Sequence, residues 1–203
     1  MNPKKLTLSL LASALTLSVL SADDTSLDEG LSKSELLEQL EEGGLILYIR
    51  HATTEKDYAD QVSADVNDGS TQRVLSEAGW HEAVHIGNAV RFYNIPVGIV
   101  LSSEYFRAWQ TAWLAFGEYE KNPDFNFLPF EDYTPEQFAE MKKRVAPYLS
   151  AIPADGTNTV IVAHDDPFEA ATGIYPEPQG VTFVLKPLGD GYQVLGSIAP
   201  DAW

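Results

Sequence analysis

Three short apolar runs, each followed at once by polar residues, limit the fold of this chain more than any other feature. The runs cover residues 45–49, 97–101 and 159–163 and are rich in Leu, Ile and Val. Each has the length of a strand, and their continuous apolar character is typical of strands buried on both faces of a parallel sheet. Because helical segments separate the runs, we expect an α/β fold with a mostly parallel central sheet.

Capping and turn residues divide the chain between these runs. We predict helices over residues 32–42, 76–93, 102–116 and 134–150, opening at Ser32, Ser76, Ser102-Ser103 and Thr134. Stretches without periodicity predict a long loop over 50–74, irregular chain over 117–133 and a short loop over 164–167. Two closing strands joined by a glycine-containing turn are expected at 181–185 and 192–198.

Residues 1–22 have the composition of a secretory signal peptide. Lys4 and Lys5 precede an apolar stretch over residues 6–20, and the small residues Ser21 and Ala22 come before two aspartates. The apolar stretch is short for a spanning helix, which needs about 20 apolar residues, so an uncleaved anchor is the less favoured alternative. We expect export with cleavage, a periplasmic or secreted protein, and no membrane contact afterwards.

The rest of the chain predicts one domain behind a short connection. Residues 23–31 are polar and acidic, and we expect a flexible linker there. Residues 32–203 suffice for a single domain with a sizeable apolar core but are short for two. Hydrophobic residues make up 44% of the whole chain and aromatic residues 11%, which indicates a globular protein and not a disordered one.

Charge and cysteine content exclude several classes of function. With 30 acidic against 13 basic residues, the formal net charge is −17, which disfavours nucleic acid and anionic lipid as partners. The chain has no cysteine, so disulfides, cysteine metal sites and cysteine nucleophiles are excluded. If the ligand is an anion, the few basic residues must be gathered where it binds.

Polar residues at the ends of the apolar runs are the candidates for chemistry, because open α/β sheets bind ligands beyond the carboxyl ends of their strands. These residues are Arg50-His51, Ser102-Ser103 and His164-Asp165. Arg107 follows in the helix after the second run. The planar fork of an arginine suits a tetrahedral oxyanion, and two arginines with two histidines at one sheet edge suit a phosphoryl group.

Four motifs in the expected order resemble the histidine phosphatase superfamily, which includes the phosphoglycerate mutases and acid phosphatases. They are the R-H-x-x-T signature at Arg50 to Thr54, the segment Leu75 to Gly79, the S-S-x-x-x-R-A-x-x-T-A stretch at Ser102 to Ala112, and the strand ending in a second histidine at Val160 to Asp165. The resemblance spans about residues 45–172. It implies the three-layer α/β/α sandwich of that family.

The resemblance also implies a role for each matching residue. His51 is the nucleophile that becomes phosphorylated, and Arg50, Arg107 and His164 hold the phosphoryl oxygens. Water then cleaves the phosphohistidine, and no metal or cofactor is implied. The substrate is expected to be a phosphorylated small molecule or a phosphoprotein.

The remaining site residues are predicted with less support from the motifs. Asp165 occupies the position of the proton donor in one branch of the family. The mutase-like branch takes a glutamate from the region that here contains Glu131 and Asp132, although no motif matches there. Thr54, Lys56 and Arg73 are candidates for substrate binding, with solvated loop charges as the alternative for the latter two.

Other functions stay open at this point. His81-Glu82-xx-His85 matches H-E-x-x-H, the zinc protease signature, with Glu104 as a conceivable third ligand. That hypothesis leaves Arg50, His51 and His164 without a role. A non-catalytic member that only binds a phosphorylated ligand, a mutase, and a phosphohistidine-protein phosphatase are further alternatives. The aromatic residues at 109–133 could line a substrate pocket, but we expect them to pack in the core.

Overall fold

The computed structural model describes residues 30–203 except 58, 63, 130 and 131. The predicted signal peptide (1–22), nearly all of the predicted linker (23–31) and the candidate Glu131 lie outside the described residues, so these predictions stay untested. Within the described part of the chain, no helix is both long and apolar enough to cross a membrane.

Thirteen elements follow one another along the described chain. They are α1 (Lys33–Glu42), β1 (Ile46–Arg50), η1 (Gly69–Thr71), α2 (Glu77–Phe92), β2 (Val97–Ser102), α3 (Phe106–Phe116), β3 (Glu120–Lys121), η2 (Pro123–Phe125), α4 (Pro135–Ser150), β4 (Asn158–Ala163), α5 (Asp165–Thr172), β5 (Thr182–Pro187) and β6 (Tyr192–Ile198). The predicted caps at Ser32, Ser76 and Thr134 are confirmed, because each side chain accepts a hydrogen bond from the first turn of its helix.

The sheet has six strands in the order β3-β2-β4-β1-β5-β6. β1, β2, β3 and β4 run parallel, whereas β5 and β6 form an antiparallel hairpin at one edge. β1 and β4 lie at the centre, with Arg50 opposite Ala163 at their carboxyl ends. The two strands that end in histidines are therefore direct neighbours.

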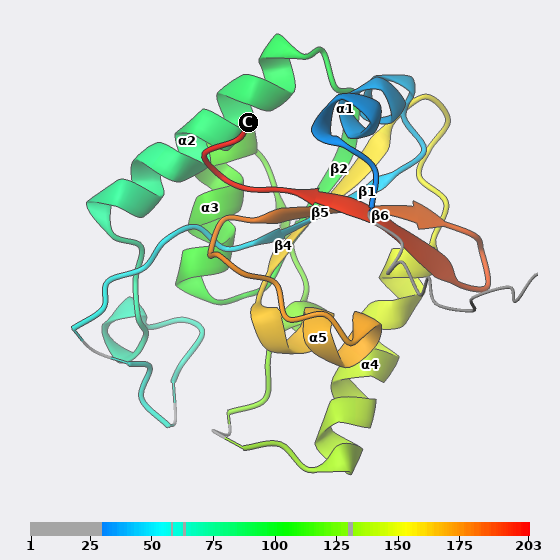
Figure 1. Ribbon diagram of the computed structural model, residues 1–203. Helices are drawn as coiled ribbons and strands as arrows, with labels where there is room; N and C mark the ends of the chain where they lie inside the picture. Colours follow the sequence, from blue (N-terminus) through cyan, green and yellow to red (C-terminus); the bar gives the residue numbers. More distant parts are fainter. Residues whose placement is uncertain (1–29, 58, 63, 130–131) are drawn as a thin grey trace, which may run out of the picture.

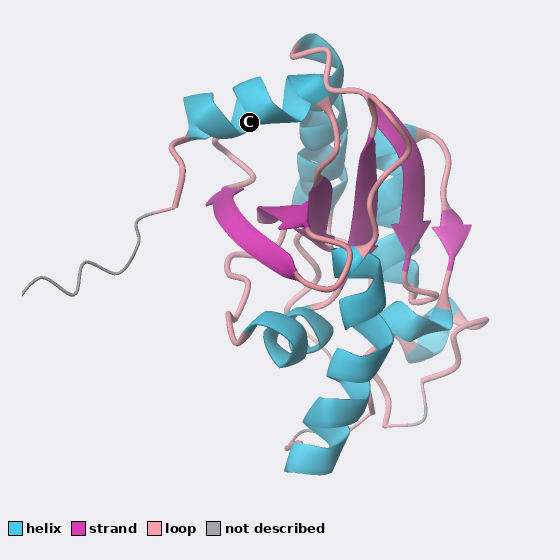
Figure 2. Ribbon diagram, turned by 90° about the vertical axis from the view of Figure 1, so that its right-hand side faces the viewer, coloured by secondary structure: helices cyan, strands magenta, loops and turns pink. Residues whose placement is uncertain are grey.

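Helices cover both faces of this sheet, as the three-layer prediction requires (Figures 1 and 2). In β1, Leu47 and Ile49 pack with α1, α2 and α3, whereas Ile46 and Tyr48 pack with α4 and α5 on the opposite face. Alternate side chains of a strand point to opposite faces, so a strand that is apolar throughout is buried on both. Trp203 packs into the first of these cores, where its Nε1 donates to Thr182 Oγ1 (3.3 Å).

Two predictions about local structure are wrong. α3 begins at Phe106 with Tyr105 as its N-cap, and not at Ser102-Ser103, because the Ser103 hydroxyl hydrogen-bonds to residues outside the helix. The chain after His164 forms α5 and not a loop. This helix is only eight residues long and opens with two aspartates and a proline, which suit the first turn of a helix as well as they suit a loop.

The long loop after β1 is anchored at both ends. Thr54 forms an isolated bridge with Leu75, and the Ser76 N–H and hydroxyl donate to the Thr53 carbonyl (3.0 and 3.1 Å). Gly79 touches the same carbonyl so closely that an added Cβ would lie 1.9 Å from its oxygen. The Leu75–Gly79 motif therefore fixes the backbone just after His51.

Candidate active site

The carboxyl end of β1 places Arg50 and His51 in the middle of the sheet edge. The His51 N–H extends the ladder with β4 by donating to the Ala163 carbonyl (2.9 Å), and the His51 carbonyl accepts from Gly180 N–H (3.0 Å). Both side chains are buried, at 6% exposure for Arg50 and 1% for His51. The backbone on either side of the candidate nucleophile is therefore held by hydrogen bonds.

The contacts of His51 determine which ring nitrogen can react. Its Nδ1 lies 2.9 Å from the Ala52 carbonyl oxygen, which can only accept a hydrogen bond. The neutral ring therefore carries its proton on Nδ1 and has a lone pair on Nε2. Burial lowers the pKa of His51 well below its usual value, and the positive charge of Arg107 lowers it further. His51 is thus a neutral imidazole suited to nucleophilic attack through Nε2.

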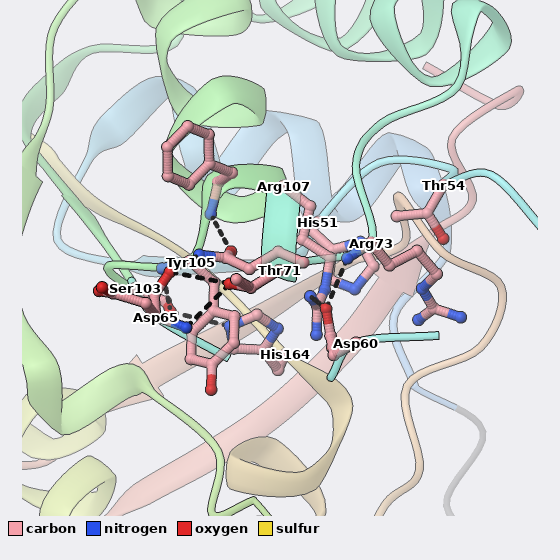
Figure 3. A network of polar contacts seen from close by, with 12 residues as sticks. His51, Thr54, Asp60, Asp65, Thr71, Arg73, Ser103, Tyr105, Arg107 and His164 are labelled. Atoms are coloured by element: carbon pink, nitrogen blue, oxygen red, sulfur yellow. Dashed lines mark hydrogen bonds and ion pairs between the residues drawn. The ribbon is translucent and has the colours of Figure 1, made fainter. Parts of the chain in front are cut away.

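α3 supplies the second arginine. Arg107 is the second residue of this helix, is 4% exposed, and lies over the rings of Tyr105 (5.2 Å) and Phe127 (5.1 Å). Its Nη1 is paired with Asp60 Oδ1 at 3.0 Å, while its Nε is buried without a partner among the described residues. A carboxylate from the long loop therefore occupies part of the guanidinium that is predicted to hold phosphate (Figure 3).

The carboxyl end of β4 supplies the second histidine. His164 is fully buried, and its ring centroid lies 5.5 Å from that of His51. Its Nε2 is 2.8 Å from Ser103 Oγ, and Phe127 and Tyr105 meet the ring edge-on. Burial, followed by the charge of Arg107, lowers the pKa of His164 well below its usual value. The structure therefore brings His51, Arg107 and His164 together, as predicted.

Asp165, the predicted proton donor, is bound by two other groups of the site. Its Oδ2 lies 2.6 Å from Arg50 Nη2 and accepts from the Tyr175 hydroxyl at 2.8 Å. Arg50 also donates from Nη1 to the Pro176 carbonyl (2.9 Å), and its guanidinium lies over the Tyr175 ring at 5.4 Å. Asp165 thus adjoins the site, and its role as donor stays a prediction.

Asp166 is a second acidic residue at the start of α5, and the motifs do not single it out. Its Oδ2 accepts from the Tyr133 hydroxyl at 3.0 Å. Burial and the neighbouring Asp165 charge raise the pKa of Asp166 to about 6, which is the range useful for proton transfer near neutral pH. Asp132, the alternative donor from the preceding region, is exposed.

The three predicted substrate-binding residues lie in different surroundings. Thr54 is 2% exposed, and its N–H donates to Gln179 Oε1 (3.0 Å), so it supports the loop. Arg73 has a buried Nε without a partner among the described residues, and lies beside Asp60 and Arg107 in Figure 3. Lys56 is exposed. Arg73 is therefore the one of the three whose position adds a donor to the site.

The H-E-x-x-H motif has a structural role in place of the zinc site. His81 and His85 are exposed on α2, whereas the Glu82 carboxylate accepts from the N–H (3.2 Å) and hydroxyl (2.9 Å) of Thr53. Glu104, the conceivable third ligand, binds Asn126. Among the described residues, no group of three or more His, Asp or Glu side chains could hold a metal ion. The motif therefore contributes to holding the loop after His51.

Asp60 and Asn126 contact the predicted site residues, although no motif points to them. Asp60 accepts from the Arg73 N–H (2.6 Å) as well as from Arg107, and Asn126 accepts from the Ser103 hydroxyl (2.7 Å). Both lie in segments without periodicity, in a chain with many acidic and polar residues, so nothing in the sequence distinguishes them. Their contacts become visible only in the folded structure, where the segment with Asp60 lies against α3 and the segment with Asn126 lies against the end of β2.

Comparisons with known proteins bear on the fold. No family model matches this sequence, and no curated protein is detectably similar to it in sequence. The protein histidine phosphatase SixA in complex with tungstate superimposes with a TM-score of 0.56 at 13% identity, covering 77% of this chain and 97% of that chain. A mycobacterial glucosyl-3-phosphoglycerate phosphatase in complex with VO3 gives 0.55 at 15% identity, covering 75% and 97%.

A mutant phosphoserine phosphatase from Entamoeba histolytica in complex with phosphoserine is also similar. Its TM-score is 0.52 at 13% identity, covering 78% of this chain and 98% of that chain. All three belong to the histidine phosphatase superfamily. At such low identities the likeness concerns the fold. The chain has the histidine phosphatase fold, as the four sequence motifs predicted.

Proposed function

We propose that this protein is an exported, metal-independent phosphatase that hydrolyses phosphomonoesters through a phosphohistidine on His51. The observation that carries the proposal is the convergence of a neutral, buried His51 with Arg50, Arg107 and His164 at the carboxyl ends of neighbouring strands. Three superfamily members of the same fold are phosphatases, two of them solved with the oxyanions tungstate and VO3, which supports an oxyanion at this place.

The proposed reaction has two steps. The Nε2 lone pair of His51 attacks phosphorus while the bond to the leaving-group oxygen breaks, and that oxygen takes a proton from an acid of the site. A water molecule then attacks the phosphohistidine, so that the N–P bond breaks and phosphate leaves. Arg107, His164 and Arg50 stabilise the charge on the phosphoryl oxygens, since phosphoryl transfer depends mainly on positioning and electrostatics.

Asp165 is the proposed acid. Its oxygen is bound to Arg50, which places it beside a group that contacts the phosphate, so that substrate binding can rearrange this pair. Arg73 is proposed to meet the remaining anionic part of the substrate, because its Nε is buried without a partner among the described residues. Thr54 supports the loop, and Lys56 at the exposed loop surface is proposed to contact only large substrates.

Hydrolysis of p-nitrophenyl phosphate by the mature protein in excess EDTA, from acid to neutral pH, tests the proposal. We expect turnover that survives EDTA and is lost in His51→Ala. Turnover that EDTA abolishes would contradict the metal-independent mechanism. Vanadate binding without turnover of any phosphomonoester would favour the alternative, a protein that only binds a phosphorylated ligand. Signal cleavage and export are tested separately by mass determination of the protein recovered outside the cytoplasm.

A further inference from the structure

Ser103 forms a hydrogen bond that the motif resemblance does not assign. The sequence predicts a cap of α3 at this serine, yet its hydroxyl oxygen lies 2.8 Å from His164 Nε2 and it is completely buried. The same oxygen contacts Asn126 Oδ1 at 2.7 Å and accepts from the Tyr105 N–H at 3.2 Å. Ser103 therefore links the second histidine of the site to a polar residue on a separate segment.

The direction of each hydrogen bond in this chain of residues can be deduced. The Glu104 backbone N–H, which can only donate, lies 3.0 Å from Asn126 Oδ1, and Asn126 Nδ2 donates to the Glu104 carboxylate at 2.8 Å. These two contacts fix the orientation of the Asn126 amide. Because Oδ1 is an acceptor, the single hydroxyl proton of Ser103 points to it.

It follows that Ser103 Oγ accepts from His164 Nε2, so neutral His164 carries its proton on Nε2. The two nitrogens of an imidazole point in nearly opposite directions, and His164 Nδ1 is buried without a partner among the described residues. Figure 3 places the ring between Ser103 on one side and His51 and Asp60 on the other. The Nδ1 lone pair therefore faces the phosphoryl site.

We propose that Ser103, Asn126 and Glu104 form a positioning chain that keeps the proton of neutral His164 on Nε2, so that Nδ1 must take up a proton when a phosphoryl group binds. This inference rests on the proposed function. Before uptake, a lone pair faces an anion, which is repulsive. After uptake, the imidazolium donates from Nδ1 to a phosphoryl oxygen and from Nε2 to Ser103.

The balance of charge in the site is consistent with this uptake. The cationic groups that act on His164 are Arg107, Arg50 and Arg73, with neutral His51 beside them, and the carboxylates of Asp60 and Asp165 offset two of the arginines. A phosphate ester monoanion can supply the proton: the O–H bond of its P–OH group breaks, Nδ1–H forms, and the dianion remains bound. With a dianionic ligand, the proton comes from solvent.

The state of His164 can be measured by ¹⁵N NMR of the free protein with labelled histidine, which requires no activity. We expect a protonated Nε2 and an unprotonated Nδ1. In Asn126→Leu, the Ser103 hydroxyl loses its acceptor and turns to donate to Nε2, so the proton should move to Nδ1. Glu104→Gln keeps an acceptor for Asn126 and is the matched control, with the wild-type tautomer. A wild-type Nδ1–H tautomer, or no change in Asn126→Leu, would overturn the proposal.

Proton uptake is measured by calorimetry of inorganic phosphate binding in buffers of different ionisation enthalpy, at a pH where free phosphate is the dianion. The His51→Ala variant is used so that uptake by the nucleophile does not contribute. We expect uptake in that variant, and less uptake when Asn126→Leu is added. Binding without uptake would refute the inference. The p-nitrophenyl phosphate assay tests the proposed function separately, since the NMR and binding results stand whether or not the ester is hydrolysed.

Discussion

The strand ends that carry the histidines and the long loop that covers them are held in very different ways. His51 and His164 follow the two central, adjacent strands and both are buried; the His51 N–H extends the ladder of the sheet, and the His164 carbonyl accepts from the buried Tyr48 hydroxyl. Asp60 in the loop reaches the same site but is held by one ion pair with Arg107 and one backbone N–H. From this comparison we expect that, in the proposed reaction, the strand ends determine the rate of phosphoryl transfer and the loop determines how readily an anion enters.

Replacing the proposed nucleophile is expected to have the largest effect. His51→Ala should abolish turnover of p-nitrophenyl phosphate, because the other histidine of the site, His164, is bound to Ser103 through Nε2 and is proposed to take up a proton on Nδ1 when phosphate binds. Phosphate binding should persist, since the arginines remain. Activity assays and calorimetry on the same preparation separate the two effects. Measurable residual turnover would remove His51 from the mechanism.

Arg107→Ala should follow, with a loss of turnover on the order of 10²-fold or more, by analogy with removal of an oxyanion donor. Its guanidinium is buried against Tyr105 and Phe127, so its position is well defined. The matched control is Arg144→Ala on α4, where the arginine forms only a partly exposed pair with Glu140. Steady-state kinetics measure both variants. Equal, small effects would place Arg107 outside the reaction.

Asp165→Asn tests the proposed proton donor. We expect slower hydrolysis of alkyl phosphates, by about 10²-fold, and a smaller effect on aryl phosphates, whose leaving groups need no proton. Asp166→Asn is the comparison, because burial raises the pKa of Asp166 to about 6 and its carboxylate lies on the same first turn of α5. If Asp166→Asn shows the leaving-group dependence and Asp165→Asn does not, the donor is Asp166.

Asp60→Asn should act in the opposite direction. The Asp60 carboxylate occupies Arg107, so an entering anion must displace it. Removing the charge should strengthen vanadate binding by about tenfold, which corresponds to the loss of one hydrogen bond to a charged group. Asp57→Asn, at an exposed position of the same loop, is the control. Weaker vanadate binding in Asp60→Asn would mean that Asp60 assists the ligand and does not compete with it.

The sequence predicts the strand ends well and the loop poorly, and the reason is physical. β1 and β4 are mostly apolar because both of their faces are buried, whereas Gly98 and Ile99 near the start of β2 are exposed. Capping residues mark the starts of α1, α2 and α4. Burial of a strand and capping of a helix each act on neighbouring residues, so they leave a recognisable pattern in the sequence. That pattern alone predicts Arg50, His51, Arg107 and His164 at one edge of the sheet.

Contacts between distant loop residues leave no such pattern. The Asp60–Arg107 pair joins residues 47 positions apart, and the Ser103–Asn126 bond joins residues 23 apart. An aspartate in an acidic chain, or an asparagine in irregular chain, is compatible with solvent exposure. A serine before a helix usually caps it, which is why the sequence predicts that role for Ser103, and its contacts with His164 and Asn126 compete with that role.

The smallest expected effect concerns how the free energy of unfolding depends on pH. The buried histidines at the strand ends should contribute to this dependence. Burial lowers the pKa of both His51 and His164 well below the ordinary value of 6.5, so the folded protein keeps them neutral where the unfolded chain protonates them. The unfolded state then binds more protons, and the free energy of unfolding should fall as pH drops below about 6.5. Their stabilising contribution is fully present above that pH.

Asp166 should partly offset this loss. Because its pKa is raised to about 6 in the folded protein, the folded state binds its proton at a higher pH than the unfolded chain does. This contribution favours folding as pH falls from about 6 toward the ordinary aspartate value of about 4. Asp166→Asn should therefore steepen the acid destabilisation in that range, and His164→Gln should flatten the slope below about 6.5.

Urea unfolding at a series of pH values measures these slopes, with His81→Gln on the exposed face of α2 as the control. The sign of each change matters more than its size, because an altered packing contact shifts the free energy of unfolding equally at every pH, whereas a titrating group changes its slope. If His164→Gln leaves the slope below about 6.5 as it is in the wild type, His164 is not held neutral by burial. The strand ends would then carry charge in the free protein, and the proton uptake inferred for phosphate binding would have no histidine left to receive it.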